Sequence, residues 1–223
     1  VSSSGGQIGG FGFRDYALPV IVYATDNYLR DPEAGYGTPG GCPLDAAGSD
    51  VAEAVNSIGG YLIGIAASGL HTNGYSLVRH MLDLDRDPSP LNEFHSELGQ
   101  TLGEALLAPH RSYYAALRPV FSLVKGMAHI TGGGLVENVP RVLPEGLEAR
   151  FDTSTWRLPP IFALLQEMGN VSRDELYRVF NMGLGVVLVC DESRAAEVMA
   201  LVPEGRIVGE VVVATSGQRV VIE

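Results

Sequence analysis

The stretch YLIGIAASGLHTNGYSLVRHML, residues 61–82, passes from an apolar run through a turn bounded by glycines into a helical pattern. The short apolar run 61–66 predicts a buried strand, and the periodic residues 75–84 predict a helix. Between them, Gly69 and Gly74 can supply tight turns, so that His71 and Asn73 project into a cleft. The stretch therefore predicts a layered α/β domain with a candidate site where a strand ends.

His71 is the titratable side chain of this turn. A histidine titrates near neutrality, so it can transfer a proton or donate a hydrogen bond to a phosphate or a developing oxyanion. The alternative is that His71 only satisfies the turn. Three further histidines have no metal-ligand spacing to each other and are expected to be solvated at the surface: His80, His95 and His110.

A second junction of the same kind is AHITGGGL, residues 128–135. Backbone N–H groups of Gly132, Gly133 and Gly134 could approach an anion at the start of a helix over 135–139. The alternative is a flexible connection. A third glycine segment, FNMGLG at 180–185, is better explained by close packing or a bulge beside the strand that follows it.

Helices and strands alternate from about residue 60 onward, which predicts an α/β or α+β layered domain with a mixed sheet and packed helices. Ser172 is a predicted N-cap, and Glu175 completes a capping box. Further strands are expected at 127–130, 147–151, 185–190, 206–213 and 219–222, and further helices at 100–107, 111–125 with a break at Pro119, 160–167, 173–180 and 193–201.

The beginning of the chain has a different character. The run LPVIVYAT, residues 18–25, predicts a buried strand that ends at Asp26, a placement that suits a metal or phosphate site. Residues 27–49 are rich in Pro and Gly, which excludes a long regular element. We therefore expect residues 1–50 to be the remnant of an N-terminal α/β domain with a linker, and residues 51–223 to be the C-terminal domain.

Composition narrows the classes of partner. The net charge of -11 opposes binding to nucleic acid or to an anionic membrane, and a small-molecule partner fits better. Lys125 is the only lysine and no GxxxxGK[ST] pattern occurs, which argues against a P-loop. The two cysteines stand apart without a ligand cluster, and the longest apolar run is too short to span a bilayer. The expected location is cytoplasmic.

Four long segments resemble the phosphoribosylformylglycinamidine cyclo-ligases, also called aminoimidazole ribonucleotide synthetases. The resemblance runs from residue 62 to about 213 and is more specific than any lone glycine motif. The segments are LIGIAASGLHTNGYSLVR at 62–79, HITGGGLVENVPRVLP at 129–144, PPIFALLQEMGNVSRDELYRVFNMGLGVVLV at 159–189 and GEVV at 209–212.

The resemblance implies an ATP-dependent ligase of purine biosynthesis. In that family ATP phosphorylates the formyl oxygen of formylglycinamidine ribonucleotide, and the amidine nitrogen closes the ring with loss of phosphate, giving aminoimidazole ribonucleotide. The resemblance also implies ATP and Mg²⁺ as cofactors and a homodimer. It implies His71 as the group that transfers protons and Asp26 as a metal ligand. We expect Ser68, Gly69, Asn73, Gly132, Gly133 and Gly134 to bind the substrate or its phosphate.

The sequence departs from the family after Asp26. Asn27 and Tyr28 stand where the family continues with GVGTK, and a GGETAEMPG segment with further acidic ligands is missing. Because Mg²⁺ depends on oxygen ligands, their loss should cripple catalysis. The alternative function is thus a catalytically inactive substrate-binding or assembly module. A selenophosphate synthetase or thiamine-phosphate kinase of the same superfamily is a weaker alternative.

Overall fold

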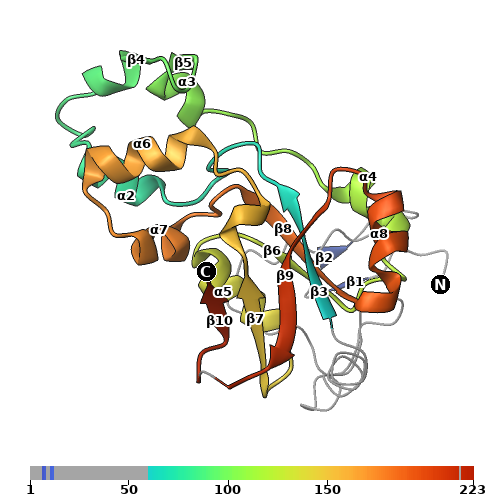
Figure 1. Ribbon diagram of the computed structural model, residues 1–223. Coiled ribbons are helices and arrows are strands. Elements are labelled where there is room, and N and C mark those ends of the chain that lie inside the picture. Colours follow the sequence, from blue (N-terminus) through green and yellow to red (C-terminus); the bar gives the residue numbers. More distant parts are fainter. Residues whose placement is uncertain (1–6, 9–10, 13–59, 216) are drawn as a thin grey trace.

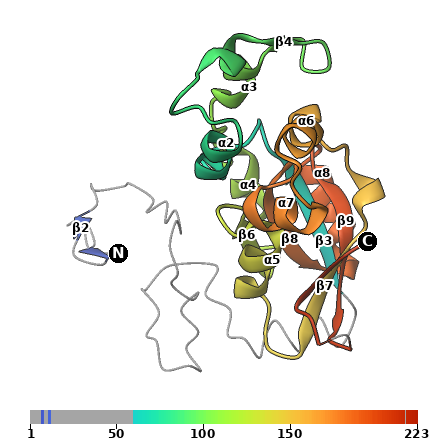
Figure 2. The ribbon, with the colours of Figure 1, turned by 90° about the vertical axis from the view of Figure 1, so that its left-hand side faces the viewer.

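A six-stranded sheet forms the centre of the computed structural model, which describes residues 7–8, 11–12, 60–215 and 217–223. Helices lie on both faces of the sheet (Figures 1 and 2), whose strand order is β10-β7-β9-β3-β8-β6. Neighbouring strands are antiparallel except β10 and β7, which are parallel. The expected mixed sheet with packed helices is confirmed. The strands are β3 (Gly60–Ala66), β6 (Gly126–His129), β7 (Leu147–Phe151), β8 (Leu184–Asp191), β9 (Arg206–Val213) and β10 (Val220–Ile222).

Strand β8 is buried along all eight of its residues. Successive side chains of a strand point to opposite faces, and those of β8 enter two separate hydrophobic clusters. Val187 and Val189 pack on one face with most of the helices, whereas Val186 and Leu188 pack on the other. This double burial explains why the strand reads as a continuous apolar run instead of an alternating one.

The helices divide between the two faces. The larger cluster includes side chains of α2, α3, α5, α6 and α7, and the smaller cluster includes those of α4 and α8. Figure 1 shows α4 and α8 on one side of the sheet and α2, α6 and α7 on the other. The helices are α2 (Tyr75–Met81), α3 (Leu102–Leu106), α4 (Tyr114–Leu117), α5 (Gly134–Asn138), α6 (Pro160–Gly169), α7 (Arg173–Val179) and α8 (Ala195–Leu201).

Two short strand pairs lie outside the main sheet. Strand β1 (Gln7–Ile8) pairs antiparallel with β2 (Phe11–Gly12), and β4 (Phe94–His95) pairs antiparallel with β5 (Gln100–Thr101). Thr101 accepts a bond from the N–H of Glu104, whose carboxylate accepts from the N–H of Thr101. This capping box starts α3 two residues later than the sequence predicted.

The prediction of a helix over 111–125 is wrong in its extent. Only α4 is α-helical there, followed by the 3₁₀ turn Arg118–Val120. Pro119 has no N–H with which to continue the α-helical hydrogen bonds, and the chain continues as the 3₁₀ turn. At α7, Ser172 accepts from the N–H of Glu175, so the predicted N-cap is confirmed.

Several sequence predictions concern residues that the structure does not describe. The strand at 18–25, the aspartate Asp26 and the domain boundary near residue 50 all lie outside the described residues. Within the described part of the chain, no helix combines the length and the apolar character needed to cross a membrane.

Replacing Leu188 by alanine should lower the free energy of unfolding by about 2–5 kcal/mol, because the side chain is 0% exposed and its removal leaves a cavity in the centre of the sheet. Leu107→Ala is the matched control, since Leu107 is 79% exposed and should change stability by less than about 0.5 kcal/mol. Urea unfolding measures both changes. Equal losses in the two variants would contradict the central position of β8.

Candidate functional site

His71 lies in the loop that follows β3, where its backbone takes the left-handed conformation with φ of 57°. The side chain is only 3% exposed. The backbone N–H of Ser68 donates to Nε2 of His71 over 3.1 Å. Because Nε2 accepts this bond, the neutral ring carries its proton on Nδ1. Nδ1 is buried and has no hydrogen-bond partner among the described residues.

The hydroxyl of Ser68 joins the His71 loop to the segment that carries His110. It donates to the carbonyl oxygen of Pro109 over 2.7 Å and accepts from the N–H of Arg111 over 3.3 Å. Both hydrogen-bonding functions of the hydroxyl are thus used within the protein. In this structure Ser68 positions two loops relative to each other.

Asn181 supports the same loop from the FNMGLG segment. Its side chain is fully buried, donates to the carbonyl oxygen of Gly69 over 2.8 Å and accepts from the N–H of Gly183 over 2.8 Å. A Cβ on Gly185 would lie 1.8 Å from the hydroxyl oxygen of Tyr113, so only glycine permits this approach. The segment therefore has the packing role that the sequence favoured.

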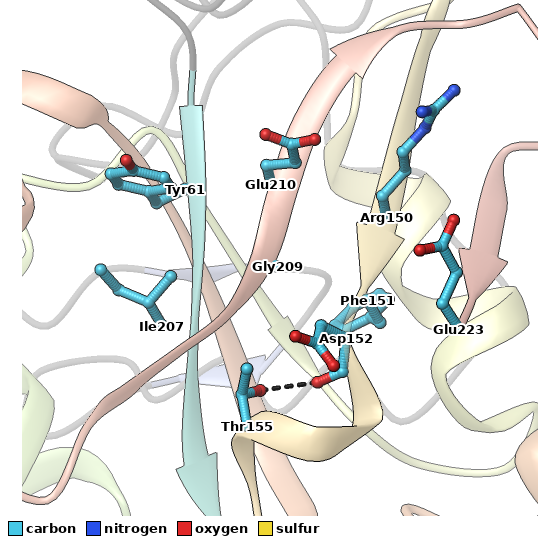
Figure 3. A pocket seen from close by; sticks show the side chains of 9 residues that line it. All are labelled: Tyr61, Arg150, Phe151, Asp152, Thr155, Ile207, Gly209, Glu210 and Glu223. Carbon is cyan, nitrogen blue, oxygen red and sulfur yellow. Dashed lines mark hydrogen bonds between the residues drawn. The ribbon is translucent and has the colours of Figure 1, made fainter.

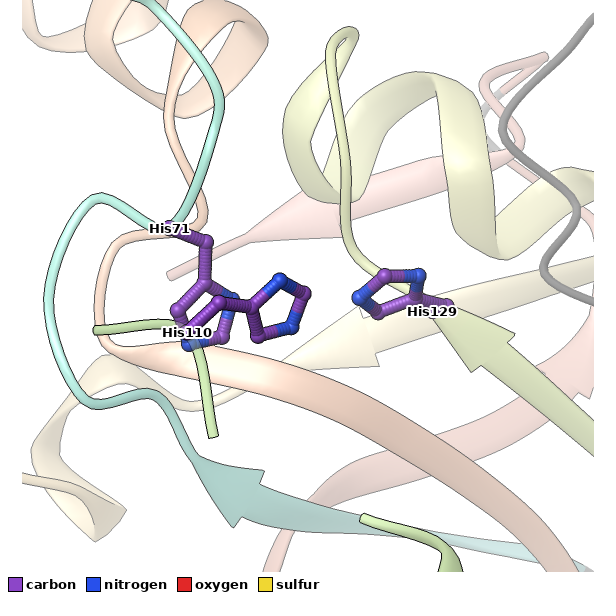
Figure 4. Close-up of side chains that lie close together, drawn as sticks. All are labelled: His71, His110 and His129. Carbon is purple, nitrogen blue, oxygen red and sulfur yellow. The ribbon is translucent and has the colours of Figure 1, made fainter. Parts of the chain in front are cut away.

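Three histidines from separate parts of the chain meet at this point (Figure 4). His110 comes from the connection between α3 and α4, and its ring stacks on that of His71 with 3.9 Å between centroids and 15° between planes. His129, the last residue of β6, lies 5.3 Å from His110 between ring centroids. One nitrogen of each ring lies within 4.8 Å of the other two.

The surroundings keep the inner histidines neutral. Burial lowers the pKa of His71 to about 4, and repulsion from His110, His129 and Arg111 acts in the same direction. Burial, and then the charge of His110, also lowers the pKa of His129. Burial raises the pKa of Tyr113, whose hydroxyl lies 3.4 Å from Nε2 of His71. At neutral pH the site thus presents uncharged imidazole nitrogens.

The glycine turn after β6 is held from inside by Asn138. The side-chain nitrogen of the buried Asn138 lies 2.8–3.3 Å from the carbonyl oxygens of Thr131, Gly132 and Gly134, and its two N–H bonds are shared among them. Gly134 has φ of 56°, and a Cβ there would lie 2.0 Å from the carbonyl oxygen of Tyr177. The turn is therefore a defined structure that requires glycine at this position.

The two predicted junctions lie at the same edge of the sheet. Strands β3 and β6 both pair antiparallel with β8, so they run in the same direction and end on the same side. The loop with Ser68, Gly69, His71 and Asn73 follows β3, and the turn with Gly132, Gly133 and Gly134 follows β6. The structure thus gathers all the predicted site residues except Asp26, which lies outside the described residues.

Sequence reasoning missed His110 and His129. His110 is exposed, as expected, yet it stacks on His71 instead of pointing freely into solvent. His129 opens the HITGGG motif at the end of a strand, a signal that could have identified it. His110 has no comparable signal, because it lies in an irregular connection that contacts between distant residues, such as the Ser68 bonds, hold at the site.

A separate depression of about 290 Å³ lies on the sheet near the opposite end of β3 (Figure 3). Tyr61, near the start of β3, and Ile207 of β9 line it together with Arg150 of β7. Its carboxylates, from Asp152, Glu210 and Glu223, do not form a metal-binding group. The depression has no feature that connects it with the histidine site.

The metal ligands that the described residues gather at this edge are imidazole nitrogens. Mg²⁺ prefers oxygen ligands in octahedral geometry. In residues 60–215 and 217–223, the one group of three or more potential metal ligands consists of histidines alone. The described residues therefore do not fit a magnesium–nucleotide site by themselves.

The fold and the loops define an α/β domain with a polar site at one edge of a mixed sheet. Residues 57–222 match the family described as AIR synthase related protein, C-terminal domain. The chain belongs to this family. It is 43% identical over 162 residues to a phosphoribosylformylglycinamidine cyclo-ligase of Alkaliphilus metalliredigens (strain QYMF), covering 70% of this chain and 46% of that protein. A phosphoribosylformylglycinamidine cyclo-ligase of Bifidobacterium longum (strain DJO10A) is 40% identical over 182 residues, covering 79% of this chain and 51% of that protein.

The chain spans about half the length of the curated relatives it matches. Among solved structures, thiamine-monophosphate kinase from Stenotrophomonas maltophilia K279a has a TM-score of 0.47 and 13% sequence identity, covering 75% of this chain and 51% of that chain. The family assignment rests on the match of residues 57–222 to the family model.

Acidification should destabilise the protein through His71. Its pKa is about 4 in the fold and about 6.5 in an unfolded chain, so the unfolded state binds the proton first as pH falls. Stability should therefore fall from about pH 6.5 down to about pH 4 and level off below, by up to about 3 kcal/mol for this group. His129, whose pKa burial also lowers, contributes to the pH dependence in the same direction.

His71→Asn should remove the contribution of His71, since asparagine tolerates the left-handed backbone but does not titrate in this range. Urea unfolding between about pH 7 and pH 4 measures it, with His80→Asn as the exposed control. If the His71→Asn variant loses as much stability on acidification as the unmodified chain, the neutral buried state of His71 is wrong.

Proposed function

We propose that this chain supplies the C-terminal half of a phosphoribosylformylglycinamidine cyclo-ligase and binds formylglycinamidine ribonucleotide at the edge where β3 and β6 end. The 43% identity to a curated cyclo-ligase over 162 residues is the observation that carries the proposal. The gathering of the His71 loop and the glycine turn at one edge supports it, because both follow strands that flank β8. The activity is ATP-dependent closure of the imidazole ring in purine biosynthesis.

In this proposal His71 acts as a hydrogen-bond donor in the proton steps. Its Nδ1 carries the proton because Nε2 accepts from the N–H of Ser68. Nδ1–H can donate to a substrate oxygen on which negative charge develops, which lowers the barrier to the reaction. Asn73, Gly132 and Gly133 are the proposed contacts for the rest of the substrate, including its phosphate.

ATP would supply the phosphoryl group that turns the formyl oxygen into a leaving group. We place the nucleotide and Mg²⁺ outside the described residues, with Asp26 as the proposed metal ligand, since the described ones offer no oxygen cluster for the metal. The proposal also includes a homodimer and a cytoplasmic location, as the family resemblance implies.

A second candidate function is a substrate-binding or assembly module without turnover. Its motivation is that the described residues offer no cluster of oxygen ligands for Mg²⁺. Calorimetry separates the two functions. Binding of the ribonucleotide without binding of magnesium–ATP favours the module, whereas binding of both favours the ligase.

His71→Asn should lower kcat for formation of aminoimidazole ribonucleotide by about 10²–10⁴-fold, the usual contribution of a positioned proton donor. A coupled assay of ADP release, with product identified by mass, measures the change. His80→Asn, an exposed residue of α2 outside the site, is the control and should leave kcat unchanged. Turnover by the His71→Asn variant at the rate of the control would contradict the role of His71, and no turnover by the intact chain would contradict the ligase.

A further inference from the structure

The histidine cluster contains two buried nitrogens that lack partners. Nδ1 of His71 and Nε2 of His129 are both inaccessible to solvent and make no hydrogen bond within the described residues. Buried polar atoms are nearly always paired, because leaving one unpaired costs about 1–3 kcal/mol. The ring of His110 lies against both of the other rings (Figure 4). We therefore expect a ligand that reaches all three rings to supply the missing partner of these nitrogens.

We propose that His71, His110 and His129 bind one divalent cation of the late first-row metals, such as Zn²⁺, through one nitrogen of each imidazole. The proposal does not rest on the proposed function. Imidazole nitrogen suits Zn²⁺, Cu²⁺ and Ni²⁺, whereas Mg²⁺ selects oxygen. Three histidines also leave a fourth position on the metal for water or another ligand.

The geometry requires a small closure of the cluster. The three nitrogens lie within 4.8 Å of one another. Two nitrogens bound to the same Zn²⁺ at about 2.1 Å each can be no more than about 4.2 Å apart. His110 must also turn, because stacked rings direct their lone pairs side by side instead of toward one point. His110 is the exposed member of the three, so it is the one that is free to make this movement.

Tyr113 provides the outer partner that the bound form of His71 needs. Metal on Nδ1 places the ring proton on Nε2, which gives up the bond from the N–H of Ser68. The hydroxyl oxygen of Tyr113 lies 3.4 Å from Nε2 and itself donates to the carbonyl oxygen of Ala66 over 3.0 Å. A chain from His71 through Tyr113 to Ala66 thus orients the ligand, as outer partners of metal-bound histidines commonly do.

The charge of the surroundings suits a cation. His71 and His129 are neutral at pH 7, as metal ligands must be. Arg111 is the cationic side chain close to the cluster, and Glu204 pairs with its guanidinium through two bonds of 3.0 and 2.7 Å. The net charge of the chain, -11, attracts cations over longer range.

The test is binding of Zn²⁺ and Co²⁺ to the 223-residue chain without an affinity tag, by calorimetry and by the visible absorption of Co²⁺. We expect one ion per chain, and no competition from Mg²⁺. His110→Ala should weaken binding by more than 10-fold, because the residue is exposed and its loss removes a ligand without opening the core. Tyr113→Phe should weaken binding by about 10–100-fold, the usual effect of losing an outer partner.

His80→Ala is the matched control, since His80 is exposed on α2 and lies outside the cluster. It should bind like the unmodified chain. Nitrogen-15 NMR of the imidazoles is a second measurement that does not depend on a variant. On addition of Zn²⁺, we expect the ring nitrogen resonances of His71, His110 and His129 to shift. The proposal would be overturned if the chain did not bind Zn²⁺. It would also be overturned if His110→Ala left Zn²⁺ binding unchanged, or if His80→Ala abolished it.

Discussion

Strand β8 is buried on both faces, and its pairing with β3 on one side and β6 on the other is the constraint on which the rest of the structure depends. Because both partners run antiparallel to β8, they run in the same direction and end at the same edge. The loops that follow them must therefore meet, although the sequence separates them widely. The site arises from this arrangement of strands and not from a local motif.

Buried amide side chains then fix the shape of the two loops. Asn181 holds the carbonyl oxygen of Gly69, and Asn138 holds three carbonyl oxygens of the glycine turn. In a low-dielectric interior such bonds are strong, and losing one partner leaves the other unpaired at high cost. These amides make the loops defined surfaces, which a ligand can meet without first ordering them.

The histidine cluster gives this edge of the domain two chemical possibilities. With its proton on Nδ1, His71 is a hydrogen-bond donor toward a substrate oxygen, which is the use that the proposed cyclo-ligase makes of it. With its proton on Nε2 and Tyr113 as acceptor, the same ring is a metal ligand. The bond from Ser68 favours the first form, and a cation would favour the second. Both uses depend on an uncharged ring, which burial ensures.

The sequence by itself determined the order along the chain of the six strands of the main sheet and the N-cap at Ser172, since these depend on local periodicity and side-chain polarity. It overestimated the helix expected over 111–125: the break at Pro119 was predicted, but the α-helix before it is only Tyr114–Leu117. It also could not place His110, which reaches His71 through bonds from Ser68 to Pro109 and Arg111. Only the tertiary structure decided that three histidines meet, because strand pairing and side-chain bonds between distant segments leave no periodic trace in the sequence.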